Sequence, residues 1–102
     1  MDLVVTIYRI TSKFPSEEKY NLTSQLRRAS VSVPSNIAEG AARKGNKEFL
    51  QFLYVALGSL AEIDTQLEIA QRLEFLHSFT EIESKTKYIR NLIIGLIRRL
   101  KS

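Results

Sequence analysis

The sequence predicts an all-α fold, an antiparallel up-down-up-down four-helix bundle formed by one domain, residues 1–102. Apolar residues recur every three or four positions through most of the chain, which is the helical period. No segment shows the alternation of a strand, and no Asn-Gly hairpin occurs. The connectors between the helical segments are short, so each helix should run antiparallel to the next. The composition, 44% hydrophobic and 25% charged, is that of an ordinary globular protein.

The first predicted helix spans residues 3–14. Its apolar stripe is Leu3, Ile7, Ile10 and Phe14. Phe14 precedes Pro15, and the residue before a proline is pushed out of the helical region, so the helix should end there. Residues 16–20 then form a polar connector with room for a single helical turn.

The second predicted helix begins after Asn21, a plausible N-cap, and reaches about Arg43 or Lys44. Its apolar residues lie on one face: Leu22, Leu26, Ala29, Val33, Ile37 and Ala41. Gly45 should supply the left-handed residue that ends a helix, and Asn46 should cap the next one. A proline inside a helix costs about 3 kcal/mol unless it is compensated, so we expect a bend at Pro34.

Polar side chains near Pro34 are expected to satisfy carbonyls that the bend frees. They are Ser30, Ser32, Ser35 and Asn36. Asn36 and Glu39 follow the proline, where they either hold the bend or reach an oligomer interface.

The third predicted helix, residues 47–72, carries two apolar stripes. One consists of Leu50, Leu53, Leu57, Leu60 and Leu67, and the other of Phe49, Phe52, Ala56, Ile63 and Ala70. One stripe suffices for a monomeric bundle, so the surplus predicts burial in an oligomer. After a turn at residues 74–77, Ser78 and Glu81 form the pattern of a capping box. The fourth helix then follows with the stripe Phe79, Ile82, Thr86, Ile89, Ile93, Leu96 and Leu100.

Charge is segregated along the chain. Residues 1–47, 48–83 and 84–102 carry net charges of +4, −6 and +6. The bundle topology should gather six basic residues at one end, namely Arg43, Lys44, Lys47, Arg98, Arg99 and Lys101. The opposite end should hold Glu68, Glu74, Glu81 and Glu83. Such asymmetry is typical of a surface that binds a polyanion.

A simpler interpretation of the basic end is complementation of the helix dipoles, which favours cations at helix C-termini by about 0.3 to 1 kcal/mol each. It does not explain Lys47, which lies at a helix N-terminus. A second basic pair, Arg27 and Arg28, could extend the basic surface or pair with acids of a neighbouring subunit. The tyrosines are stacking platforms for bases in one interpretation and core or interface residues in the other.

Features of catalysis and metal binding are missing from the sequence. There is no cysteine, the single histidine is His77, and no Glu-x-x-His pair of a carboxylate metal site occurs. We therefore expect no enzyme activity, no metal, no cofactor and no small-molecule substrate. No apolar run is long enough to span a membrane, and the absence of cysteine fits a cytoplasmic location.

Four segments resemble a family of four-helix-bundle proteins encoded by intervening sequences of bacterial large-subunit ribosomal RNA genes. They are LTSQLRRA (22–29), PSNIAEG (34–40), KEFLQFL (47–53) and GSLAEIDTQL (58–67). A related branch serves as accessory proteins of the reverse transcriptases of diversity-generating retroelements. The sequence departs from the family pattern in a short segment before Phe14 and in Ala41-Ala42, where relatives are richer in Gly and Arg.

The resemblance implies a ring-like homopentamer without enzymatic activity. For the retroelement branch it also implies a basic surface that engages nucleic acid and the reverse transcriptase. Our leading hypothesis is a homo-oligomeric, nucleic-acid-binding accessory protein that contacts RNA or DNA phosphates. The alternative is a structural or protein-interaction module without nucleic-acid binding.

Overall fold

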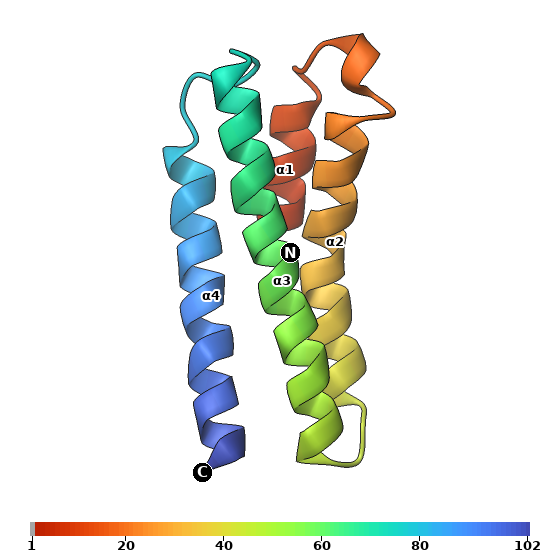
Figure 1. Cartoon of the computed structure of the whole chain (residues 1–102), viewed down its shortest axis with the longest axis vertical. Helices are drawn as coiled ribbons and strands as arrows, with labels where there is room; N and C mark the ends of the chain where they lie inside the picture. Colours follow the sequence, from red (N-terminus) through yellow and green to blue (C-terminus); the bar gives the residue numbers. More distant parts are fainter. Residues whose placement is uncertain (1) are drawn as a thin grey trace.

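The computed structural model describes residues 2–102, and these form four α-helices and one short 3-10 helix without any strand. The elements are α1 (Asp2–Thr11), η1 (Ser16–Glu18), α2 (Leu22–Ala41), α3 (Asn46–Arg72) and α4 (Thr80–Lys101). Consecutive helices run in opposite directions along the long axis (Figure 1). The predicted all-α class and four-helix bundle are confirmed.

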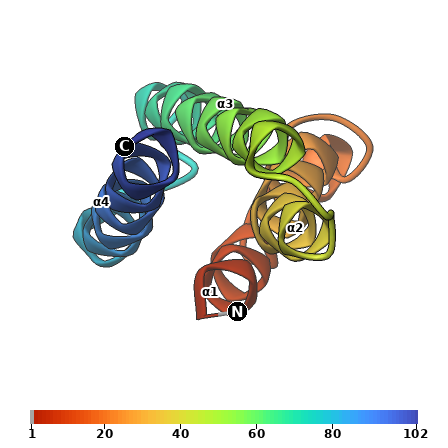
Figure 2. The ribbon, with the colours of Figure 1, turned by 90° about the horizontal axis from the view of Figure 1, so that it is seen from below.

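The helices surround the core in chain order, as the view along the bundle shows (Figure 2). The α2–α3 contact is the most extensive, while α4 packs less extensively against α3 and α1. Buried apolar side chains come from every helix: Leu3, Ile7, Phe14, Leu22, Leu26, Ala29, Val33, Leu53, Ala56, Leu60, Ile63, Leu67, Ala70, Ile82, Ile93 and Ile97. The helical stripes in the sequence therefore identify most of the core.

Helix α1 ends at Thr11, three residues earlier than predicted. The backbone N–H groups of Lys13 and Phe14 bond to the carbonyls of Ile10 and Thr11, three residues back, so the chain tightens and turns. Phe14 is thereby buried against Phe75, with ring centroids 5.7 Å apart. The single helical turn expected in the following connector is η1.

Helix α2 runs through Pro34 without interruption. The Asn36 side-chain amide donates to the carbonyl of Ser32 at 2.8 Å and to its hydroxyl at 2.9 Å. The Ser32 hydroxyl also lies 2.8 Å from that of Ser59 on α3, and Ser30 donates to the carbonyl of Arg27. Ser30 and Asn36 thus bond to local carbonyls, but neither acceptor is the Ser30 carbonyl that Pro34 leaves without its helical N–H partner, so the expected satisfaction of freed carbonyls stays a prediction. Ser32 instead links two helices. The bend itself stays a prediction.

The turn between α2 and α3 differs from the prediction. Helix α2 ends at Ala41, and Gly45 has a φ of −119°, which is not left-handed. Gly45 is the N-cap of α3, so Asn46 is its first residue instead of its cap. The prediction was wrong because Ala42 ends α2 in the right-handed conformation, with its N–H bonded to the carbonyls of Ala38 and Gly40, so no left-handed residue is needed. A Cβ on Gly40 would lie 2.7 Å from Cβ of Phe52, so α2 and α3 approach closely just before the turn.

The turn between α3 and α4 contains the one described non-glycine residue with positive φ, Glu74 at 65°. The N–H of Phe75 bonds to the carbonyl of Ala70, and that of Glu74 bonds to the carbonyl of Gln71. These two bonds define a Schellman motif, whose left-handed position usually holds glycine. The predicted capping box is absent, because α4 begins at Thr80 and its N-cap is Phe79 without a side-chain bond.

Replacing Glu74 with glycine should raise the free energy of unfolding by about 0.5 to 1 kcal/mol. A side chain strains the left-handed conformation, and glycine removes that strain at some cost in unfolded-state entropy. Urea denaturation followed by circular dichroism measures the change. Glu74→Ala is the matched control, because it removes the carboxylate and keeps the Cβ. An equal gain in the free energy of unfolding in both variants would show that loss of the carboxylate, and not relief of backbone strain, causes the gain.

Candidate nucleic-acid interface

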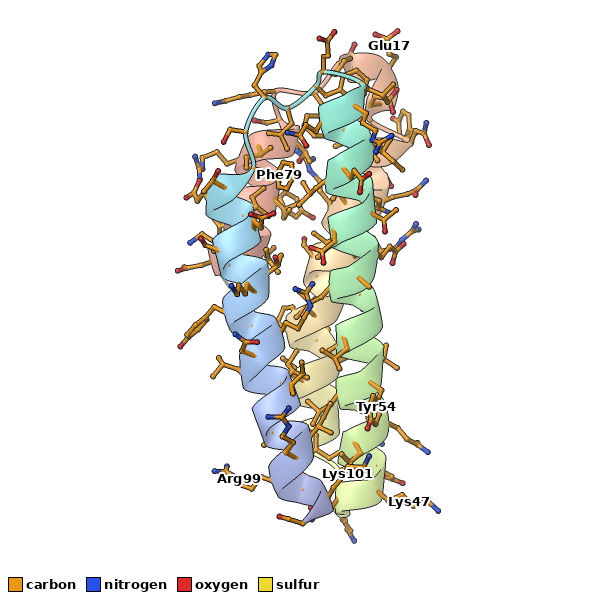
Figure 3. All side chains as sticks on the ribbon, turned by 60° about the vertical axis from the view of Figure 1, so that its left-hand side comes forward. Glu17, Lys47, Tyr54, Phe79, Arg99 and Lys101 are labelled. Carbon is orange, nitrogen blue, oxygen red and sulfur yellow. The ribbon has the colours of Figure 1, made fainter. Side chains whose placement is uncertain are left out.

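Three helix ends meet at the lower end of the bundle and carry the six predicted basic residues, which we call the basic pole. Arg43 and Lys44 lie in the α2–α3 turn, Lys47 is the second residue of α3, and the others end α4. All six side chains are exposed. Lys47, Arg99 and Lys101 are seen at the same end in Figure 3. The antiparallel topology thus gathers charges that are more than 50 residues apart in the sequence.

The α2–α3 turn forms a shallow depression of about 460 Å³ at the basic pole. Its lining residues are Ala42, Arg43, Lys44, Gly45, Lys47 and Glu48. The chain leaves α2 at Ala41 and enters α3 at Asn46, so the early end of α2 exposes these residues. Cations and free N–H groups at the start of α3 make this surface electropositive, although Glu48 reduces its charge.

One cation of the basic pole is neutralised within the chain. Arg43 pairs with the Glu39 carboxylate at 3.0 Å, and its guanidinium lies 5.0 Å from the ring centroid of Phe52. Among residues 2–102, no carboxylate lies within 4.0 Å of the other five cations. These five charges are therefore available to an external anion.

Lys101 contacts a tyrosine instead of an acid. Its ammonium donates to the Tyr54 hydroxyl at 3.2 Å, from the end of α4 to the outer face of α3. Tyr54 and Lys101 lie beside each other in Figure 3, and Lys47 lies further toward the start of α3. Tyr54 was not among the residues predicted at the basic pole, although its position seven residues after Lys47 puts both on one face of α3.

Two acids that were not predicted there, Glu39 and Glu48, also lie at the basic pole. The spacing of Glu39 and Arg43, four residues apart on one helix, is the usual spacing of an ion pair and could have revealed the contact. Glu39 is exposed, while Asn36 is half-buried in the polar contact between α2 and α3.

Arg27 and Arg28 lie away from the basic pole. Arg27 lies 14 residues before Ala41, the last residue of α2, a distance of about 21 Å at the helical rise. The Arg27 side chain donates to the Thr11 hydroxyl at 2.9 Å and lies 4.5 Å from the ring centroid of Tyr8. Arg27 thus links α2 to α1, whereas Arg28 is exposed.

The opposite end of the bundle is less acidic than the sequence suggests. Glu81 pairs with Arg9 at 2.9 Å and Glu68 pairs with Arg72 at 3.0 Å. Asp64 also pairs with Arg90 between α3 and α4. The charge asymmetry of the molecule therefore comes mainly from the basic pole.

Residues 2–102 contain neither a helix suited to crossing a membrane nor a cluster of metal-binding side chains. No helix in this part of the chain combines the length and apolarity needed to cross a membrane. No group of three or more metal-binding side chains was found in the same range.

The family model described as 23S rRNA-intervening sequence protein matches residues 1–95. A similar solved structure is a Bacteroides thetaiotaomicron protein described as having unknown function and as coming from the S23 ribosomal protein family. It is 23% identical, with a TM-score of 0.76 over 92% of this chain and 87% of that chain, which supports the fold. No match was found among curated proteins. The chain belongs to the family of 23S rRNA-intervening sequence proteins.

Proposed function

We propose that this protein is a homo-oligomeric, non-catalytic accessory protein that binds RNA or DNA through the phosphate backbone. The observation that carries the proposal is the basic pole, where six exposed cations converge and five have no carboxylate partner among the described residues. Lysine and arginine contacts to phosphates supply affinity without base specificity. The basic pole is therefore suited to many nucleic-acid sequences.

Exposed apolar side chains on α3 support the oligomeric part of the proposal. Val55, Ile69 and Leu73 are each about half exposed. Burying them against a second copy would remove apolar surface from water. The family resemblance suggests a pentamer, in which five basic poles would form one positive surface and weak contacts would add through avidity.

The resemblance to accessory proteins of retroelements also suggests a reverse transcriptase as a protein partner. In that role, the oligomer would hold the RNA template for the enzyme. The same apolar surface also fits the alternative, a protein-interaction module whose charges serve only solubility and helix ends. The two hypotheses differ in whether the basic pole binds nucleic acid.

Fluorescence anisotropy of a labelled structured RNA tests the proposal directly. The protein is titrated at about 50 mM and about 200 mM salt, since each phosphate contact adds nearly one unit to the slope of log affinity against log salt. A variant with all six residues of the basic pole changed to glutamine should lose the binding. With five or more contacts, the wild-type affinity should fall by about a thousand-fold over this salt range.

The matched control changes six other basic residues to glutamine and so has the same net charge. These are Arg9, Lys13, Lys19, Arg28, Arg72 and Lys87. If this control loses RNA binding as completely as the basic-pole variant does, the loss comes from the lower net charge and not from the basic pole. Absence of binding at low salt, or binding that the basic-pole variant retains, would favour the interaction module. Light scattering on the same samples gives the oligomer mass, and a monomer of 11.7 kDa would contradict the oligomer.

A further inference from the structure

We infer that the basic pole selects single-stranded nucleic acid by stacking an unpaired base on the ring of Tyr54. This inference rests on the proposed function, because it specifies which form of nucleic acid the basic pole binds. It starts from an exposed aromatic ring placed among cations, the arrangement that proteins use to hold single strands. Phosphate contacts alone would not distinguish a single strand from a duplex.

Tyr54 lies on the outer face of α3 with its side chain 48% exposed. Lys47 is seven residues earlier and Gly58 four residues later, so both share this face. Nothing lies within 4 Å of the position of a Cβ on Gly58. The surface of α3 next to Tyr54 therefore has no protruding side chain at position 58, which leaves space for a planar base.

The position of Lys101 leaves the faces of the Tyr54 ring open. Its ammonium is 3.2 Å from the hydroxyl oxygen but 5.8 Å from the ring centroid. Since the hydroxyl lies on the line from the centroid through the ring edge, these two distances place the ammonium beyond the hydroxyl, near the ring plane. Lys101 thus orients the ring by its edge and keeps its positive charge beside the site of the base.

Lys101 lies at the hydroxyl edge of the ring, and Lys47 lies seven residues earlier, toward the start of α3 (Figure 3). A base on Tyr54 would have its own sugar-phosphate chain within reach of these ammonium groups. In a duplex, the bases are stacked on each other and their faces are closed to a protein side chain. Only an unpaired nucleotide can use the ring and the cations together.

The other tyrosines do not offer this combination. The Arg27 guanidinium is 4.5 Å from the ring centroid of Tyr8, which places it over that ring. Tyr20 lies just before α2, at the end of the bundle opposite the basic pole. Tyr88 is 66% exposed, but 13 residues of α4 separate it from Lys101, or about 20 Å. Tyr88 is therefore a suitable control position.

The test compares an RNA single strand of about 12 nucleotides, within the range of single-strand binding sites, with a duplex of the same length. Tyr54→Leu should weaken binding of the single strand by on the order of ten-fold and leave binding of the duplex nearly unchanged. Tyr54→Phe should retain the affinity because it keeps the ring. Tyr88→Leu should change neither affinity.

A spectroscopic measurement tests stacking independently of affinity. The chain contains no tryptophan, so Tyr54→Trp introduces a single fluorophore at the proposed site, and Tyr88→Trp introduces one at the control site. The single strand should quench the fluorescence at position 54 and not at position 88. Unchanged single-strand affinity in Tyr54→Leu, together with no quenching at position 54, would overturn the stacking site and leave phosphate binding intact. Failure of the wild type to bind either RNA would overturn the proposed function as well.

Discussion

Gly40→Ala is expected to lower the free energy of unfolding by about 2 kcal/mol, although alanine is the better helix former. The new Cβ would lie 2.7 Å from Cβ of Phe52 and 2.8 Å from Cδ1 of Phe49. The Phe52 atom is fixed to the α3 backbone, so the helices must separate. Overpacking of this kind costs about 1 to 3 kcal/mol, which exceeds the gain of about 1 kcal/mol in helix propensity.

The same substitution at Gly58 should have the opposite sign. Gly58 is an exposed position of α3 with nothing within 4 Å of the added Cβ, so Gly58→Ala should raise the free energy of unfolding by about 0.5 to 1 kcal/mol. Denaturant unfolding of both variants measures the two values under identical conditions. Stabilisation by Gly40→Ala would show that α2 and α3 do not approach as closely as described.

Leu60→Ala should lower the free energy of unfolding by about 3 to 4 kcal/mol. Leu60 is fully buried in the middle of α3, the helix that packs against both α2 and α4. Its truncation loses transfer free energy and leaves a cavity that the surrounding helices fill only partly. A small domain has about 5 to 15 kcal/mol of stability in total, so the variant should unfold at a much lower denaturant concentration.

The matched control is Leu92→Ala on α4, where the same atoms are removed from a side chain that is 55% exposed. A surface change of this kind should alter the free energy of unfolding by less than about 0.5 kcal/mol. Circular dichroism at increasing urea concentrations gives both values. A loss of several kcal/mol at Leu92 would mean that this side chain is buried in solution, as in an oligomer interface.

The helices and their buried faces could be predicted from the sequence because the helical period is a local property. The stripe on residues 22–41 contains Leu26, Ala29 and Val33, all of which are buried. The convergence of the six cations at one end of the bundle could also be predicted from the sequence, since it requires only the helix order and short connectors. These features depend on the pattern of residues and not on the details of packing.

The turns could not be predicted because packing between helices decides them. Gly45 was expected to be left-handed, whereas Glu74 is the residue that adopts positive φ. Local preference favours glycine in that role. However, Glu74 is fixed by the two hydrogen bonds that end α3, while its neighbour Phe75 packs against Phe14.

The individual contacts of the candidate site also depended on tertiary structure. Tyr54 and Lys101 are 47 residues apart, and no sequence pattern relates them. Arg27 was grouped with the basic residues by its charge, but it packs on Tyr8 of α1. The sequence therefore predicted which charges gather at one end better than the contact that each charge makes.

The basic pole is divided between two parts of the bundle that differ in how firmly they are held. Arg43, Lys44 and Lys47 belong to the closely packed α2–α3 hairpin, whereas the other three cations end α4, which packs less extensively. Regions with fewer buried contacts open at lower free energy, and their amide hydrogens exchange sooner. Fraying of the last turns of α4 would move three cations and leave three in place. In the proposed function, the hairpin would provide the fixed part of the phosphate-binding surface, and the end of α4 would provide a part that can adjust to the ligand.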